Sequence, residues 1–102
     1  MRVIKPATLK DYWAKYRSAK KPLTEWLATV QEADWKDHTE VRQTYPHADT
    51  VTVASGANVT VFNIKGNDYR LIVAIHYNTG IVFIRDFMTH AEYSKDKWKE
   101  RH

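Results

Sequence analysis

The spacing of apolar residues changes once along the chain, near residue 50, from a period of about 3.6 to a period of 2. The longer period is that of an amphipathic helix, and the shorter one is that of a strand with one buried face. Helices followed by a run of strands predict an α+β fold with two layers, in which the helices pack on one face of a sheet. Because 102 residues leave room for one hydrophobic core, we expect a single domain over residues 1–102.

Two helices are expected in the first half. The first covers residues 8–18, and the second begins near Lys21-Pro22 and ends near residues 34–35. Their apolar residues recur at helical spacing: Leu9, Tyr12, Trp13 and Tyr16, then Leu23, Trp26, Leu27 and Val30. Such stripes favour core packing between antiparallel helices over base stacking by the aromatic rings. One or two further helical turns are expected at residues 39–45.

The second half predicts an antiparallel meander, and residues 2–5 predict a short edge strand. Runs of β-forming residues at 51–64, 69–77 and 81–87 are separated or interrupted by turn residues at 55–58, 65–68 and 78–80. Alternation along residues 69–77 places Leu71 and Val73 against the helices. It places Arg70 and His76 on the opposite, more open face. Whether Arg85 or Asp86 faces that side cannot be decided from the pattern.

Charge and composition narrow the class of protein. The net charge is +4 and the pI is near 9.4, which favours a polyanionic partner such as RNA, DNA or a ribosome. Residues 1–49 and 50–102 each carry a net +2, so we expect the charge to be spread out, with no basic tail. The absence of cysteine, of an apolar span of about 20 residues and of a signal peptide indicates a cytoplasmic protein.

Few residues offer chemistry. The chain has no motif typical of a metal site or of a nucleotide-binding loop, so we expect no metal and no cofactor. The polar end of the last strand, residues 88–93, contains His90 and Tyr93, both of which can move protons. Arginine can hold a phosphate with two parallel hydrogen bonds, so Arg70 with these two suits phosphodiester chemistry. The residue types alone leave open a structural role for each.

Three segments together resemble a known family. They are Phe62-Asn63-Ile64-Lys65-Gly66-Asn67-Asp68-Tyr69-Arg70-Leu71-Ile72-Val73, Ile81-Val82-Phe83-Ile84-Arg85 and Thr89-His90-Ala91-Glu92-Tyr93. They closely resemble HigB-type toxins, a branch of the RelE superfamily. Residues 3–11 and 34–36 also look like that branch, so the likeness spans nearly the whole chain and the order of its elements.

The resemblance implies a RelE-like fold and a bacterial type II toxin that cleaves mRNA on the translating ribosome. It implies a partner, a HigA-type helix-turn-helix antitoxin, through which alone the toxin reaches operator DNA. It also implies cleavage without a metal, in which the 2′-OH of the substrate attacks the neighbouring phosphate. The protein then supplies a base, a cation and an acid.

The resemblance also assigns roles to residues. Arg70 matches the strand arginine and is the expected cation, while His90 and Tyr93 match the terminal motif and are expected to share the proton transfers. Imidazole titrates near neutrality and phenol near ~10, which makes histidine the more natural base, but the division stays open here. RNA contacts are assigned to Lys65, Asn67 and Arg85.

The sequence departs from the pattern of many RelE relatives, because Arg85 is its only basic residue between Arg70 and Lys95. This departure leaves the assignment of acid and base open. Two other functions also stay open. One is a toxin of the same fold with another target, as in the ParE-like gyrase poisons, since fold alone does not determine function. The other is a non-catalytic module that binds RNA or protein.

Overall fold

The computed structural model describes residues 1–102, and its elements follow the order that the periodicity predicts. The helical first half contains β1 (Arg2–Ile4), α1 (Thr8–Lys15), the 3₁₀ helix η1 (Arg17–Ala19), α2 (Lys20–Glu32) and α3 (His38–Thr44). The second half contains β2 (Asp49–Thr52), β3 (Asn58–Ile64), β4 (Tyr69–His76), β5 (Ile81–Thr89), α4 (His90–Ser94) and the 3₁₀ helix η2 (Lys97–Arg101). None of the helices is long and apolar enough to span a membrane.

The strands form one five-stranded sheet with the order β1-β5-β4-β3-β2. The meander from β2 to β5 is antiparallel throughout, as expected. The edge position of β1 is also as expected, but β1 pairs with β5 in parallel, so the sheet is mixed rather than wholly antiparallel. A strand of three residues has too short an alternation to indicate its partner or its direction.

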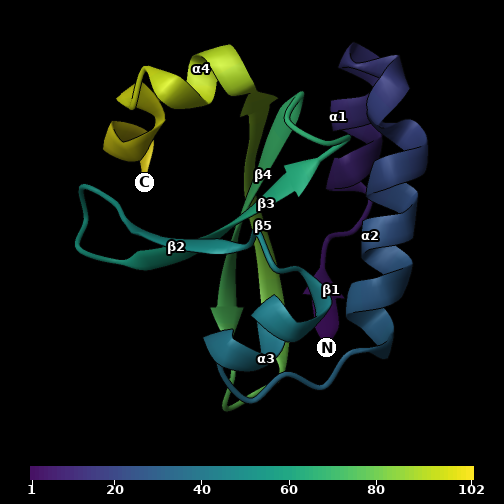
Figure 1. Ribbon diagram of the computed structural model, residues 1–102, viewed down its shortest axis with the longest axis vertical. Helices are drawn as coiled ribbons and strands as arrows, with labels where there is room; N and C mark the ends of the chain where they lie inside the picture. The colour runs from purple at the N-terminus through teal and green to yellow at the C-terminus, as the bar shows by residue number, and fades with distance from the viewer.

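The helical hairpin of α1 and α2 covers one face of the sheet (Figure 1). Leu9, Leu23 and Trp26 are buried there against Phe62 and Leu71. The rings of Trp26 and Phe62 meet edge to face, with 5.5 Å between their centroids. The α+β class and the helical hairpin on one face are therefore confirmed, and the aromatic stripe of the helices is core, as its spacing indicates.

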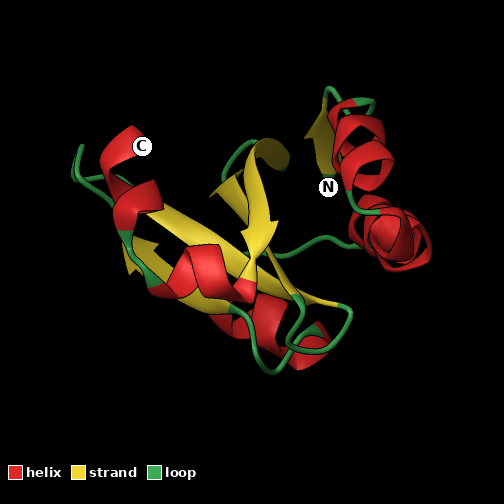
Figure 2. Ribbon diagram, turned by 90° about the horizontal axis from the view of Figure 1, so that it is seen from above, coloured by secondary structure: helices red, strands yellow, loops and turns green.

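The opposite face is not as open as the sequence predicts. Viewed from above, the C-terminal helical segment lies on the other side of the sheet from the hairpin (Figure 2). Trp98 of η2 is buried on this face in a second small core with Val53, Val59, Val61, Ile72 and Met88. As a result Arg70 is only 8% exposed, so its expected place on an open face is corrected, whereas His76 at the far end of β4 is exposed.

Candidate active site around Arg70

The turn between β3 and β4 positions the residues around Arg70. Ile64 pairs with Tyr69 and Asn63 pairs with Arg70, which leaves residues 65–68 as the turn. Lys65 and Gly66 both adopt positive φ, of 55° and 62°, and Gly66 does so without the steric cost that a side chain brings. Because cross-strand partners share a face of the sheet, Asn63 and Arg70 lie side by side.

The guanidinium of Arg70 is anchored by this turn. Its Nη1 donates to the carbonyl oxygens of Asn67 (3.3 Å) and Tyr69 (3.1 Å), and its Nη2 donates to Oδ1 of Asn67 (3.3 Å). Nε donates to no protein acceptor and Nη2 donates to only one, so the edge of the guanidinium plane that Nε and Nη2 share is not fully used by the protein. That edge has the two parallel donors with which an arginine binds a phosphate or carboxylate.

Tyr93 packs on Arg70 from α4. The guanidinium carbon lies 5.6 Å from the centroid of the Tyr93 ring, which is within the range of a cation–π interaction. The other neighbour of this ring is Trp98, stacked at 5.2 Å and 19°, and the indole N–H of Trp98 donates to the carbonyl oxygen of Tyr93 (3.1 Å). Tyr93, stacked on Trp98, therefore covers Arg70 and reduces its contact with water.

α4 begins directly where β5 ends, because Thr89 caps it: the Thr89 hydroxyl accepts a hydrogen bond from the backbone N–H of Glu92 (3.2 Å). The carboxylate of Glu92 accepts a hydrogen bond from the hydroxyl of Tyr16 (3.3 Å), and this contact joins α4 to the helical hairpin. Met88, the second residue before the helix, pairs with Arg70. These contacts explain why Tyr93 lies over Arg70 although the two are far apart in sequence.

The protonation of Tyr93 is biased by its surroundings. Burial raises the pKa of the Tyr93 hydroxyl, and the negative charge of Asp49 raises it further, while the positive charge of Arg70 opposes both. The net pKa is above that of a free phenol. At neutral pH Tyr93 therefore carries its proton.

A polar hollow of about 520 Å³ adjoins Arg70. It is lined by His47, Asn63, Gly66 and Asn67, with no hydrophobic side chain among them. His47 comes from the loop between α3 and β2, so this loop and the turn before β4 form opposite sides of the hollow. Amides and an imidazole offer both donors and acceptors, as the edges of nucleobases do.

The structure brings some of the predicted site residues together and leaves others apart. Arg70, Tyr93 and Asn67 are in contact. Lys65, in the same turn, is exposed and pairs with Asp68 at 3.5 Å. His90 is the first residue of α4; its backbone N–H donates to the carbonyl oxygen of Asp68 (3.0 Å), and its side chain is exposed.

Arg85 is the predicted residue most separate from this group. The pairing of β4 with β5 shifts between Ile72 and Val73, because Ile72 pairs with Asp86 while Val73 pairs with Ile84. Arg85 is therefore the unpaired residue of a β-bulge, and it is exposed. Asp86, in contrast, shares the face of Ile72 and Arg70.

Sequence reasoning did not single out His47, Asn63 or Trp98. The position of Asn63 could have been predicted from the sequence, because a four-residue turn at 65–68 pairs Asn63 with Arg70. Nothing in the sequence places His47, on a loop, opposite this turn. No group of three or more His, Asp or Glu side chains is arranged so that it could hold a metal ion.

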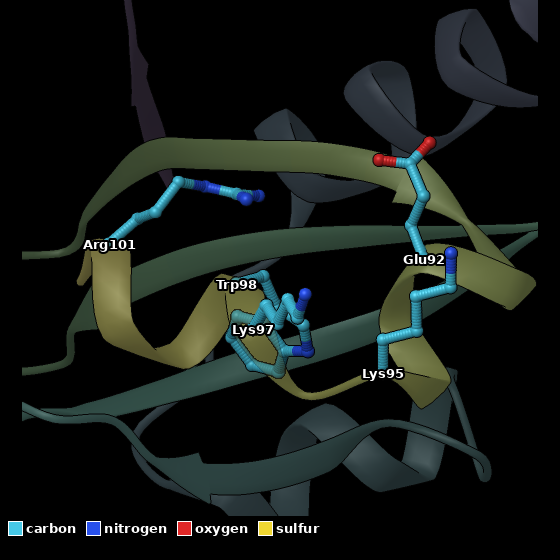
Figure 3. Close-up of a pocket in the computed structure, with 5 residues that line it drawn as sticks. All are labelled: Glu92, Lys95, Lys97, Trp98 and Arg101. Carbon is cyan, nitrogen blue, oxygen red and sulfur yellow. The ribbon is translucent and has the colours of Figure 1, made fainter.

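A second, smaller hollow of about 140 Å³ lies between α4 and η2 (Figure 3). It is lined by Glu92, Lys95, Lys97, Trp98 and Arg101. Arg101 is already paired, since its Nη2 lies 2.8 Å from Oδ2 of Asp86. The C-terminal segment is joined to α4 by the stack of Trp98 on Tyr93.

The sequence of the chain is similar to those of known toxins. The sequence profile of a family described as HigB_toxin, RelE-like toxic component of a toxin-antitoxin system, matches residues 19–96. The mRNA interferase toxin HigB of Escherichia coli (strain K12) is 28% identical over 93 residues, which cover 91% of this chain and 88% of the relative. The mRNA interferase HigB of Escherichia coli O6:H1 (strain CFT073) is 25% identical over 95 residues, covering 93% of this chain and 90% of the relative.

Proposed function

The chain belongs to the HigB family of RelE-like toxins, and from this membership we propose that it is an endoribonuclease that cleaves mRNA during translation on the ribosome. The resemblance to HigB-type toxins is confirmed by the match over residues 19–96. Relatives that cover most of the chain are named mRNA interferases, which supports cleavage of mRNA as the activity. As the toxic component of a toxin–antitoxin system, the chain has an antitoxin partner.

The free edge of the Arg70 guanidinium is the observation that carries the proposal. The turn holds the other side of the guanidinium, so the Nε and Nη2 donors are preorganised to bind a phosphate. A scissile phosphate gains negative charge on its non-bridging oxygens as the transition state forms. A fixed cation with two parallel donors stabilises that charge without reorganising.

The proposed reaction needs only groups of the chain and the RNA. The 2′-oxygen attacks the adjacent phosphorus and loses its proton to the imidazole of His90. The bond from phosphorus to the 5′-oxygen breaks, and that oxygen takes a proton from the hydroxyl of Tyr93. The products are a 2′,3′-cyclic phosphate and a 5′-hydroxyl end.

Tyr93 is assigned the role of the acid because a phenol keeps its proton at neutral pH. Its raised pKa makes the hydroxyl a weaker donor, and the positive charge of Arg70 opposes that shift. His90 is exposed next to the turn, where the imidazole can reach an RNA strand that lies over Arg70. The same arrangement supports RNA contacts by Asn67, which lines the polar hollow, and by Lys65, which is exposed in the same turn. Arg85, at its exposed bulge, would meet the RNA farther along the strand.

The proposal extends to partners and compartment. The antitoxin is proposed to be a HigA-type helix-turn-helix protein, so that contact with operator DNA is made only through it. A substrate held on the translating ribosome places the toxin in the cytoplasm. Whether the adjacent reading frame encodes a small helix-turn-helix protein is a direct check of the partner.

Ribosome dependence is tested with two copies of one transcript that differ only in the start codon. Toxin is expressed without antitoxin, and primer extension maps the 5′ ends in both copies. We expect cuts inside the reading frame of the translated copy alone. Equal cutting of both copies would remove the ribosome from the mechanism, and growth arrest without cuts but with inhibited DNA supercoiling would favour a gyrase target. Toxicity that survives in a triple variant of Arg70, His90 and Tyr93 would favour a non-catalytic module.

A further inference from the structure

A concentrated positive patch lies where α1 meets α2. Lys15, Arg17, Lys20 and Lys21 fall within seven positions that contain no acidic residue, and all four are exposed. We call these four residues the basic corner. They form a local cluster of positive charge, although the two halves of the chain carry the same net charge of +2.

The basic corner is not explained by ion pairs within the chain. The side-chain ion pairs join Lys36 to Asp34, Lys65 to Asp68, Lys99 to Asp96, and Arg101 and His102 to Asp86. The basic corner takes part in none of them. Within the corner, only Lys15 has an aromatic neighbour, with its Nζ 5.3 Å from the ring centroid of Tyr16.

The position of two of these lysines opposes helix stability. Lys20 and Lys21 lie in the first turn of α2, where no acidic residue is present. The amino end of a helix carries partial positive charge, so acidic side chains stabilise it and basic ones destabilise it. Helix stability alone would favour acidic residues at these positions. The two lysines therefore point to a role in binding rather than in folding.

Two residues that alternate with those of the basic corner, Tyr16 and Ser18, hydrogen-bond to neighbours of the candidate active-site residues. The hydroxyls of Ser18 and Tyr69 lie 2.9 Å apart, and the hydroxyl of Tyr16 donates to Glu92 at 3.3 Å. Tyr69 precedes Arg70, and Glu92 precedes Tyr93. Figure 1 shows the junction of α1 and α2 at the same end of the molecule as α4. A polyanion bound to the corner would therefore lie at the same end of the molecule as α4, which carries Tyr93 over Arg70 (Figure 1).

We propose that the basic corner binds the sugar–phosphate backbone of double-helical RNA, the form that structured ribosomal RNA presents, and thereby docks the toxin beside its substrate. This inference rests on the proposed function for the identity of the RNA. Each of the four side chains is a cation on a flexible stem, which suits contact with phosphates independent of sequence.

The surroundings of the basic corner favour a duplex over single-stranded RNA or a protein. No large hydrophobic side chain of the chain is exposed. Tyr16, the aromatic residue inside the corner, packs on the core against Tyr69 and Phe87. Single strands are bound by stacking bases on aromatic side chains, and protein interfaces usually have an apolar centre. A surface of cations that has neither an exposed stacking ring nor an apolar centre fits a regular phosphate backbone.

The test compares two variants that each remove two positive charges. Lys20→Gln/Lys21→Gln alters the basic corner, and the matched control, Arg2→Gln/Lys36→Gln, alters exposed residues outside it. Affinity for a fluorescent RNA hairpin with a long stem is measured by anisotropy across a range of salt concentrations. We expect the corner variant to bind about 10- to 100-fold more weakly near 0.1 M salt, with a salt slope shallower by roughly two. The control should stay within about twofold of the parent.

Thermal unfolding accompanies each measurement. Because neutralising Lys20 and Lys21 relieves the conflict with the helix dipole, the corner variant should melt at the same temperature as the parent or higher. Weaker RNA binding with an unchanged or raised melting temperature therefore supports a contact with RNA rather than a folding defect. A lowered melting temperature that matches the loss of binding would overturn the proposal.

Three further outcomes would also overturn it: equal weakening in both variants, unchanged affinity in the corner variant, or RNA binding that is kept while binding to the antitoxin is lost. The hairpin assay does not depend on cleavage. If mRNA is not cut but the corner variant loses hairpin binding, the proposed function fails and the basic corner stands. If mRNA is cut on ribosomes but hairpin binding does not change in the corner variant, the proposed function stands and the proposal for the basic corner fails.

Discussion

The guanidinium of Arg70 lies against the ring of Tyr93, with 5.6 Å between the guanidinium carbon and the ring centroid. The other neighbour of Tyr93 is Trp98, stacked at 5.2 Å. The position of Tyr93 over the strand arginine thus depends on Trp98, which is buried by the folding of η2 onto the sheet. Cleavage and the packing of the C-terminal segment are therefore expected to be coupled.

Arg70→Ala should abolish toxicity. Removing one preorganised electrostatic contact to a developing charge typically lowers a rate on the order of 10²- to 10³-fold. Arg70→Lys should restore little, because an ammonium cannot reproduce the two parallel donors on Nε and Nη2. The measurement is single-turnover cleavage of mRNA on programmed ribosomes.

Thermal unfolding of both variants is the control for Arg70, because this side chain is only 8% exposed and binds two backbone carbonyls. Arg70→Lys keeps a positive charge near those carbonyls, so it separates loss of chemistry from loss of fold. Cleavage by Arg70→Ala within a fewfold of the parent, or a defect that exists only because the variant no longer folds, would leave Arg70 a structural residue.

Tyr93→Phe should separate proton transfer from packing. The ring remains stacked between Arg70 and Trp98, so the melting temperature should change little, while loss of the hydroxyl removes the proposed acid. General acid–base catalysis contributes typically 10²- to 10⁴-fold, which sets the expected loss of rate. An RNA with a 5′-bridging sulfur at the cleavage site, whose leaving group needs no acid, should be cut equally by Tyr93→Phe and the parent. A defect of the same size on both RNAs would argue against the acid role.

The helices and the meander could be predicted because their hydrophobic period is a local property. Leu9, Trp26, Leu71 and Val73 are buried as the pattern indicates. The burial of Arg70 could not be predicted, since it depends on Trp98 packing onto the second face of the sheet from 28 residues away. Alternation states which face a residue occupies, but not what covers that face.

The candidate site could be predicted only in part. The family resemblance indicated Arg70 and Tyr93, which are in contact. The bulge at Arg85 could not be predicted from the pattern, because residues 81–84 before it are apolar on both alternations. The bulge places Asp86 on the same face of the sheet as Arg70. His47 reaches the hollow from a loop, where no periodicity exists to predict its direction.

Chelation should leave cleavage unchanged. The proposed reaction takes its base, its cation and its acid from His90, Arg70 and Tyr93, so no step requires a divalent ion. Ribosomes themselves need magnesium, so the assay uses ribosomes fixed by crosslinking before EDTA is added. Their integrity is checked by sedimentation in the same samples. Restoration of a lost activity by one added transition metal, at constant magnesium, would contradict metal-independent cleavage.

The acid stability of the fold should depend on Asp86, which holds the end of the chain over the second face of the sheet. Its Oδ2 accepts a hydrogen bond from Arg101 at 2.8 Å and lies 3.0 Å from Nε2 of His102. Burial by itself raises the pKa of the Asp86 carboxyl. The hydrogen bonds from His102, Arg101 and the backbone N–H of Phe87 outweigh it, so the net pKa is lowered.

A carboxyl whose pKa is lower in the folded state than in the unfolded state, where it is near 3.9, stabilises the protein at pH values above the unfolded pKa. This contribution is lost as the pH falls toward the pKa of the folded state. Asp86→Asn should therefore lower the free energy of unfolding at neutral pH, by about 1 to 3 kcal/mol for a charge-assisted contact. The difference from the parent should begin to shrink below about pH 4, where the carboxyl of the unfolded parent takes up a proton, and should disappear as the pH falls through the lower pKa of the folded state. Urea unfolding at a series of pH values measures it, with Asp34→Asn, an exposed acid in a surface pair, as the matched control that should change little. A constant difference between Asp86→Asn and the parent from neutral pH down to pH 3 would mean that the carboxylate charge does not hold the C-terminal segment in place.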